Sequence, residues 1–195
     1  PNGYSTMVYS KGPWVIHMLR ELFRDPASGS DAAFLGALRG LAPHVGATGS
    51  GRDGEQRPGS QGAGLAEQSD APLTTDEFIR RLEAALPAGA DVEGTGKLDW
   101  FFEQWVYNTG IPHYKLRWEA RADGTAWRVE GSIEQSEVSE VFTMPLPVWA
   151  RRGREWTKLG AVVVTGSKVE FRFPAEWKPE EVRLDIHGAV LAVYE

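Results

Sequence analysis

The residues with the most chemical potential gather at the beginning of the chain. Tyr4 and Tyr9 lie five residues apart, and Tyr9 opens the run Tyr9-Ser10-Lys11-Gly12 directly ahead of an amphipathic segment. A tyrosine hydroxyl can donate a hydrogen bond to a developing oxyanion without carrying charge itself. The N-terminal end of a helix adds a field that favours such an anion. Taken alone, the pattern fits a tyrosine packed on the surface at least as well, so both interpretations stay open.

Metal chemistry and serine chemistry find less support in the sequence. The four histidines, His17, His44, His113 and His187, include no pair at the i, i+4 spacing that places two imidazoles on one helical face. The chain has no cysteine, which excludes thiolate ligands and disulfides. A serine nucleophile needs a rigid, strained turn, and the Gly-Ser pairs at 49–50 and 59–60 lie in a stretch without core residues. We therefore expect no metal ligands and no cofactor-binding residues within these 195 residues.

Composition narrows the class of partner. Hydrophobic residues make up 42% of the chain and charged residues 25%, a normal globular balance. The net charge of −6 argues against nucleic acid as a partner, because nucleic-acid binding needs a basic surface. No apolar run approaches the roughly 20 residues of a membrane span. Cytoplasmic and periplasmic or secreted locations are both compatible with the composition.

The first part of the chain shows helical periodicity. Apolar residues at i, i+3, i+4, i+7 and i+8 predict a helix over 12–24, and Asp31 is the candidate N-cap of a second helix. Thr74 and Glu77 fit a capping box that opens a third helix, and a fourth is predicted from Lys97 to about 109. The stretch 48–72 is rich in Gly, Ser, Gln and Arg, which predicts a flexible surface insertion rather than a phosphate-binding loop.

After His113 the apolar period changes from about 3.6 to 2. About seven short strands separated by turn signals predict a small antiparallel, immunoglobulin-like β-sandwich over 113–195, the last two strands at 182–186 and 189–194. Pro145 and Pro147 alternate with apolar residues, which suggests that their strand lies at the edge of a sheet. The predicted fold class is α+β, with a helical part at 1–112 and the sandwich behind it.

Four motifs, in this order, carry a resemblance to the aminopeptidase N-like zinc metallopeptidases, the group that includes leukotriene hydrolase. The first is Tyr4 with the YSKG run at 9–12 and the VIHMLR that follows at 15–20. The second is the capped helix TTDEF at 74–78. The third is WFFEQWVY at 100–107, running into GIP at 110–112. The fourth is the β-rich stretch after Tyr114, with GSIEQ and MPLPV. Only the combination is specific.

The resemblance implies a role for each tyrosine. In that family the tyrosine of Tyr-x-Lys-Gly stabilises the tetrahedral oxyanion when a zinc-bound water attacks the scissile carbonyl. Tyr9 matches this residue, and Tyr4 matches an active-site neighbour of the same motif. The helices would then be the C-terminal half of a thermolysin-like (gluzincin) catalytic domain, and the peptide substrate would lose residues from its N-terminus.

The departures from the family pattern are equally specific. The family's HExxH zinc motif, its further glutamate and its Gly-x-Met-Glu-Asn loop precede the tyrosine, and this chain contains none of them. We therefore expect a C-terminal fragment of a zinc aminopeptidase that is inactive alone. The zinc and the N-terminal half of the catalytic domain would lie elsewhere, and exposed apolar helix faces could drive self-association. Two alternatives remain: a non-catalytic binding or scaffold module, and a lone sandwich interaction domain with a helical extension.

Overall fold

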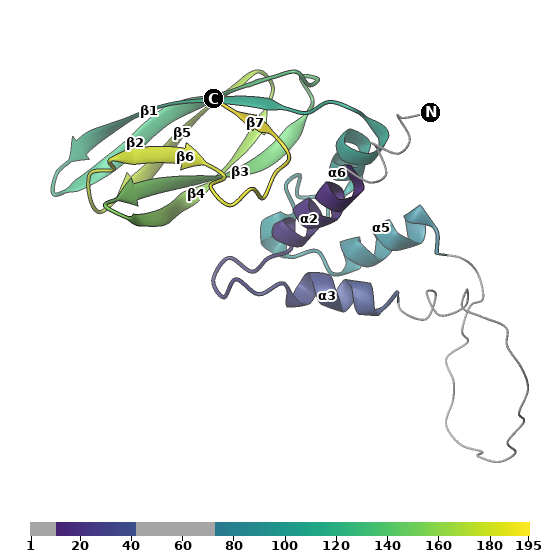
Figure 1. Ribbon diagram of the computed structural model, residues 1–195. Coiled ribbons are helices and arrows are strands. Elements are labelled where there is room, and N and C mark those ends of the chain that lie inside the picture. The colour runs from purple at the N-terminus through teal and green to yellow at the C-terminus, as the bar shows by residue number, and fades with distance from the viewer. Residues whose placement is uncertain (1–10, 42–72) are drawn as a thin grey trace, which may run out of the picture. The chain divides into compact units, whose positions relative to one another are not determined.

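The computed structural model describes residues 11–41 and 73–195, and helices precede strands along it (Figure 1). The α+β class predicted from the change of period is confirmed. The predicted insertion at 48–72 lies outside the described residues, as do Tyr4, Tyr9 and His44. Within the described ranges, no helix combines the length and the apolar character that crossing a bilayer requires.

The chain divides into two compact units. One comprises Pro1–Leu22 and Asp91–Glu195, and the other Phe23–Ala90. The helix that follows the YSKG run thus belongs to the same unit as the sandwich, although the two are far apart in the sequence. The division of the chain into a peptidase part at 1–112 and a sandwich domain at 113–195 stays a prediction.

The smaller unit, Phe23–Ala90, contains two described helices and a short 3-10 turn, α3 (Ala32–Arg39), α5 (Thr75–Ala84) and η3 (Ala88–Ala90). The Thr74 hydroxyl accepts the backbone N–H of Glu77 at 3.2 Å, as the capping box predicts. The Glu77 carboxylate takes the Arg81 guanidinium at 2.8 Å one turn later. Asp31 does occupy the N-cap of α3, but its side chain makes no capping hydrogen bond.

Two helical segments belong to the larger unit. The first, α2 (Gly12–Leu22), buries Val15, Met18 and Leu19 on one face. It ends two residues before the predicted end, a difference usual for frayed helix termini. The second begins as α6 (Asp99–Phe102) and continues without a break as a π-helical turn, η4 (Glu103–Tyr107). Helical periodicity predicted the segment, but not the wider turn at its end.

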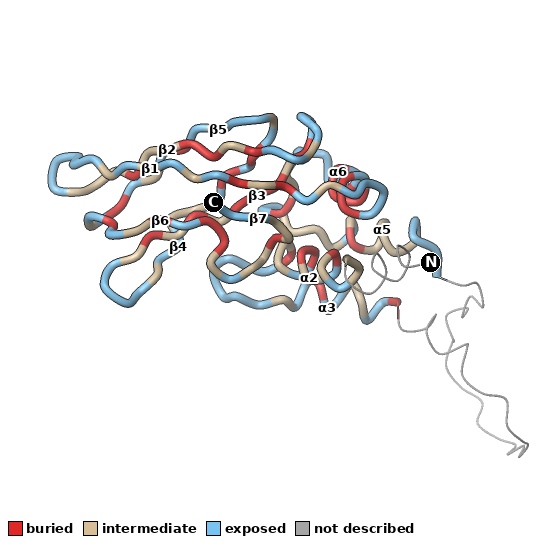
Figure 2. The backbone as a smooth tube through the Cα atoms, turned by 45° about the horizontal axis from the view of Figure 1, so that its top comes forward, coloured by how far each residue is buried: buried red, intermediate tan, exposed pale blue. Residues whose placement is uncertain are grey.

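Two sheets pack face to face in the same unit. One has the order β5-β2-β1-β7 and the other β4-β3-β6. Along β3, buried side chains alternate with less buried ones, and the buried positions appear in red in Figure 2. The strands are β1 (His113–Asp123), β2 (Ala126–Ser136), β3 (Thr143–Arg152), β4 (Glu155–Thr165), β5 (Lys168–Ala175), β6 (Glu181–Leu184) and β7 (Val193–Tyr194).

The prediction of an edge position for the proline-bearing strand is wrong. β3 is the central strand of its sheet, between β4 and β6. β6 pairs only with Val148 to Arg151, so Pro145 and Pro147 lie beyond the end of its ladder. The Pro147 carbonyl accepts the Asp185 N–H at 2.9 Å, which shows that this side of the proline backbone faces β6 rather than β4. The missing proline N–H groups therefore leave the long β3–β4 ladder intact.

The prediction of a wholly antiparallel sandwich, with its last strand at 189–194, also needs correction. β7 is limited to Val193–Tyr194 and runs parallel to β1. The chain leaves β6 in one sheet, turns at Asp185 to Gly188 and enters the other sheet beside β1. A strand that arrives by such a crossing is free of the hairpin geometry that makes neighbours antiparallel.

Candidate functional site

The structure describes the second half of the YSKG run. Tyr4 and Tyr9, the residues predicted to do chemistry, lie outside the described residues, and their roles stay predictions. Lys11 and Gly12 are described, and α2 begins at Gly12. The surroundings of Lys11 therefore define what holds the end of the motif.

Lys11 is bound to a different part of the sequence. Its ammonium donates a hydrogen bond to the backbone carbonyl of Asn108, 97 residues away, and lies 6.0 Å from the centre of the Trp105 ring. Partial burial lowers the pKa of Lys11 below its ordinary value, because desolvation penalises the charged form. A cation over an aromatic face and on a carbonyl recovers part of that loss.

The partner of Lys11 is the π-helical turn η4. Such turns are rare and frequently occur at functional sites. The Asn108 side chain closes the turn by donating to the Glu103 carbonyl at 2.9 Å. Trp105 is fully buried and meets the Phe142 ring edge-on at 5.3 Å. The hydrogen bond to Glu103 and the packing of Trp105 therefore hold the Asn108 carbonyl in place.

Gln104 joins the same turn to the sandwich. Its amide nitrogen donates to the Thr143 carbonyl at 2.6 Å, and its amide oxygen accepts the Thr143 N–H at 3.0 Å. The side chain thus imitates one rung of a β-ladder at the first residue of β3. Gln104 is buried and both bonds are partly buried, so a backbone group left without its partner here would be costly.

A second connection joins α2 to the segment after β6. His17 Nε2 lies 3.0 Å from the Gly188 carbonyl oxygen, and the Leu191 N–H donates to the Met18 sulfur at 3.5 Å. His17, which the sequence places on the helix beside its apolar stripe, therefore connects distant parts of the unit. Both contacts depend on the shape of the 185–191 segment.

Asp185 sets that shape. It is buried, and its backbone has a φ of 40°, in the left-handed region that non-glycine residues rarely adopt. Its carboxylate accepts the N–H groups of Ala189 at 2.7 Å and Val190 at 2.8 Å, and the Tyr194 hydroxyl at 2.9 Å. Burial and the neighbouring carboxylate raise the pKa of Tyr194 well above its usual range. The sequence offered no signal for this cluster, because Asp185 fell within the strand predicted at 182–186, whereas β6 ends at Leu184.

Two open pockets belong to the larger unit. One, of about 380 Å³, lies beside the π turn and is lined by Gln104, Asn108, Gly110 and the 137–139 loop. Glu137 in that loop has a φ of 65°, and a Cβ on Gly110 would lie 3.3 Å from the Glu137 carbonyl oxygen. The close approach of the two loops shapes this pocket.

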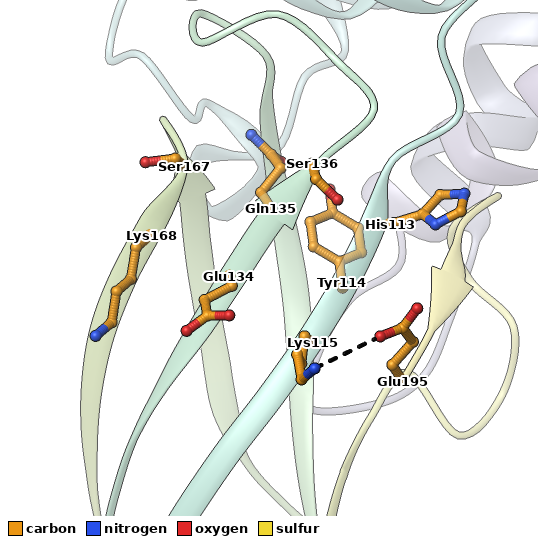
Figure 3. A pocket seen from close by; sticks show the side chains of 9 residues that line it. All are labelled: His113, Tyr114, Lys115, Glu134, Gln135, Ser136, Ser167, Lys168 and Glu195. Atoms are coloured by element: carbon orange, nitrogen blue, oxygen red, sulfur yellow. Dashed lines mark ion pairs between the residues drawn. The ribbon is translucent and has the colours of Figure 1, made fainter.

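The other pocket, of about 520 Å³, crosses one end of the four-stranded sheet (Figure 3). Side chains of Lys168, Glu134 and Lys115 come from the neighbouring strands β5, β2 and β1. Lys115 pairs with Glu195 across 3.9 Å. The pocket carries charges of both signs, which suits solvation of the sheet face rather than a defined reaction.

The described histidines do not come together as ligands. In residues 11–41 and 73–195, no group of three or more His, Cys, Asp or Glu side chains could hold a metal ion. What the described residues bring together is a positioning framework: Lys11, the π turn and Thr143 of β3.

Comparisons with known proteins add a likeness of fold. No protein-family model matches the sequence, and no curated protein matches it. Among solved structures, the chain is similar to aminopeptidase A of Legionella pneumophila in complex with aspartic acid, with a TM-score of 0.61 and 14% sequence identity. The match covers 98% of this chain but only 18% of the aminopeptidase. The helices and the sandwich of this chain therefore share their fold with part of an aminopeptidase.

Proposed function

We propose that these 195 residues are the C-terminal part of a zinc-dependent aminopeptidase that removes N-terminal residues from peptides. The observation that carries the proposal is the agreement between two independent likenesses. The ordered motifs resemble zinc aminopeptidases, and nearly the whole chain shares its fold with part of one. In this proposal the helices complete a thermolysin-like catalytic domain.

Tyr9 is the catalytic residue that this chain supplies. Its hydroxyl donates to the oxyanion of the tetrahedral intermediate, and Tyr4 lines the same site. Zinc, when bound by the HExxH part of the enzyme, activates the attacking water. This chain's own contribution is to present the phenol at the beginning of α2, whose first residues are tied to the π turn by Lys11.

The HExxH part of the enzyme is also the proposed partner of the chain. Val106, Tyr107 and Ile111 are 45%, 59% and 41% exposed on the segment that carries the π turn. Exposed apolar side chains grouped in this way mark contact surfaces. We place the missing half of the catalytic domain against them, and expect self-association through them when that half is absent.

The test is the Tyr9→Phe variant of the enzyme that contains both halves. Loss of one oxyanion donor is expected to lower kcat by about 10²–10³-fold, with KM and zinc content unchanged. A Thr157→Val variant, which removes a hydroxyl from an exposed side chain on β4, serves as the control. A Tyr9→Phe enzyme with the native kcat would refute the role of Tyr9.

The alternative of a non-catalytic binding module makes the opposite prediction. If the full-length protein lacks an HExxH motif and binds no zinc, the proposed zinc-dependent hydrolysis is excluded. Zinc analysis of the full-length protein by inductively coupled plasma mass spectrometry separates the two functions before any kinetics.

A further inference from the structure

We propose that Lys11 is a positioning residue, which ties the first turn of α2 to the π-helical turn and thereby fixes the chain directly after Tyr9. The tie itself is independent of the proposed function. Its consequence for Tyr9 rests on that function.

Two contacts of Lys11 with the described part of the chain carry this proposal. The ammonium donates to the carbonyl of Asn108, the residue after η4, and lies over the ring of Trp105 within η4. Neither contact is with a carboxylate, so the interaction is not an ion pair. An ammonium engaged with a backbone carbonyl is suited to holding position rather than to binding an anionic group of a substrate.

The acceptor carbonyl is itself well placed. Asn108 follows the last residue of η4 in an extended conformation, with φ −113° and ψ 164°. Carbonyls at the C-terminal end of a helical segment carry its negative partial charge, which favours a cation there. The bond from the Asn108 side chain to the Glu103 carbonyl, at 2.9 Å, holds this residue against the turn.

The turn cannot move freely, because it is fixed to β3. Gln104 makes two hydrogen bonds with the backbone of Thr143, and Trp105 packs edge-on against Phe142. β3 is in turn the central strand of its sheet. A continuous path of contacts therefore runs from the sandwich through the π turn to the ammonium of Lys11.

The short separation of Lys11 from Tyr9 links this contact to the proposed catalytic residue. Tyr9 and Lys11 are two residues apart, so an anchored Lys11 restricts where the Tyr9 backbone can lie. An enzyme loses catalytic rate when a hydrogen-bond donor in its active site is displaced by about 1 Å. Lys11 of the YSKG run thus positions Tyr9 through the backbone that joins them.

Amide hydrogen exchange on this chain tests the tie directly. Lys11→Met keeps the length of the side chain but removes the ammonium, and Lys11→Arg keeps a cationic donor. We expect exchange at Val15, Ile16 and His17 to become about tenfold faster in Lys11→Met and to stay near the native rate in Lys11→Arg. Exchange at Ile133 in β2 reports whether the sandwich is intact.

Lys158→Met is the matched control, because Lys158 is an exposed lysine on β4 of the same unit. It should leave exchange at Val15 to His17 unchanged. Native exchange rates at these three amides in Lys11→Met would overturn the proposal.

Kinetics of the enzyme that contains both halves test the consequence. Lys11→Met should lower kcat about tenfold without changing KM or zinc content, and Lys11→Arg should recover most of the loss. Native kcat in Lys11→Met, alongside a large loss in Tyr9→Phe, would overturn the positioning of Tyr9. Native kcat in Tyr9→Phe would instead refute the proposed function, and exchange would still decide the tie.

Discussion

Gln104 offers the sharpest test of how the π turn is held to the sandwich. Replacing it with methionine keeps an unbranched side chain of similar length but removes both amide groups. The Thr143 N–H and carbonyl, bonded at 3.0 Å and 2.6 Å in the native chain, would lose their partners. Each buried backbone group left unmatched costs about 1–3 kcal/mol.

Both bonds are only partly buried, so each loss should cost an amount in the lower part of that range. Together the two losses should lower the free energy of unfolding by about 2–4 kcal/mol. Urea unfolding followed by tryptophan fluorescence measures it. With a urea slope of about 2 kcal/mol per M for a unit of this size, the midpoint should fall by about 1–2 M.

Two further variants control this experiment. Glu103→Met changes the exposed neighbour in the same turn and should shift stability by less than about 0.5 kcal/mol. Gln104→Glu should be destabilised at neutral pH, because its carboxylate would face the Thr143 carbonyl. It should regain stability as pH falls toward about 4.3, because burial beside a carbonyl raises the folded-state pKa of this carboxyl above that unfolded value, and the protonated acid can donate like the amide. A Gln104→Met protein as stable as Glu103→Met would refute the reasoning.

Further predictions concern the sandwich. Gly131→Ala should prevent folding or lower stability by more than about 3 kcal/mol, measured by urea unfolding, because its Cβ would lie 2.2 Å from the Arg117 carbonyl oxygen. Asp185→Asn should destabilise by about 2 kcal/mol, seen as a lower Tm, since an amide cannot accept all three donors. Tyr114 and Tyr194, whose pKa values are raised chiefly by burial, should stay protonated in the folded chain above pH 10, as absorbance at 295 nm would show. Because the unfolded chain ionises them near pH 10, stability should fall as pH rises past that value.

Much of the local structure follows from short-range patterns in the sequence. The stripe Val15, Met18 and Leu19 predicts α2, and Thr74 with Glu77 predicts the cap that opens α5. The Asp123-Gly124 turn predicts the β1–β2 hairpin, where Gly124 has the expected positive φ of 65°. Each of these signals depends only on neighbours in the chain, which is why periodicity and turn chemistry suffice.

The candidate site was predicted in part. The sequence singled out Tyr9 and Lys11 by residue type and spacing, but gave Lys11 no partner. Neither the π turn nor the Asn108 carbonyl carries a distinctive residue pattern, because the acceptor is a backbone group. The sequence placed His17 beside the apolar stripe of its helix without a partner, and the structure shows its ring at the Gly188 carbonyl.

The sequence by itself thus determined the α+β class, the helical run before His113 and the strands after it, because burial alternates with the period of each element. It also put a phenol at position 9 and an ammonium at position 11, ahead of Gly12, where α2 begins. Only the tertiary structure decided that β3 is central, that β7 runs parallel to β1, and that Lys11 is held by a turn 97 residues away. Local patterns report which face of an element is buried. Which distant segment covers that face is decided when the whole unit packs.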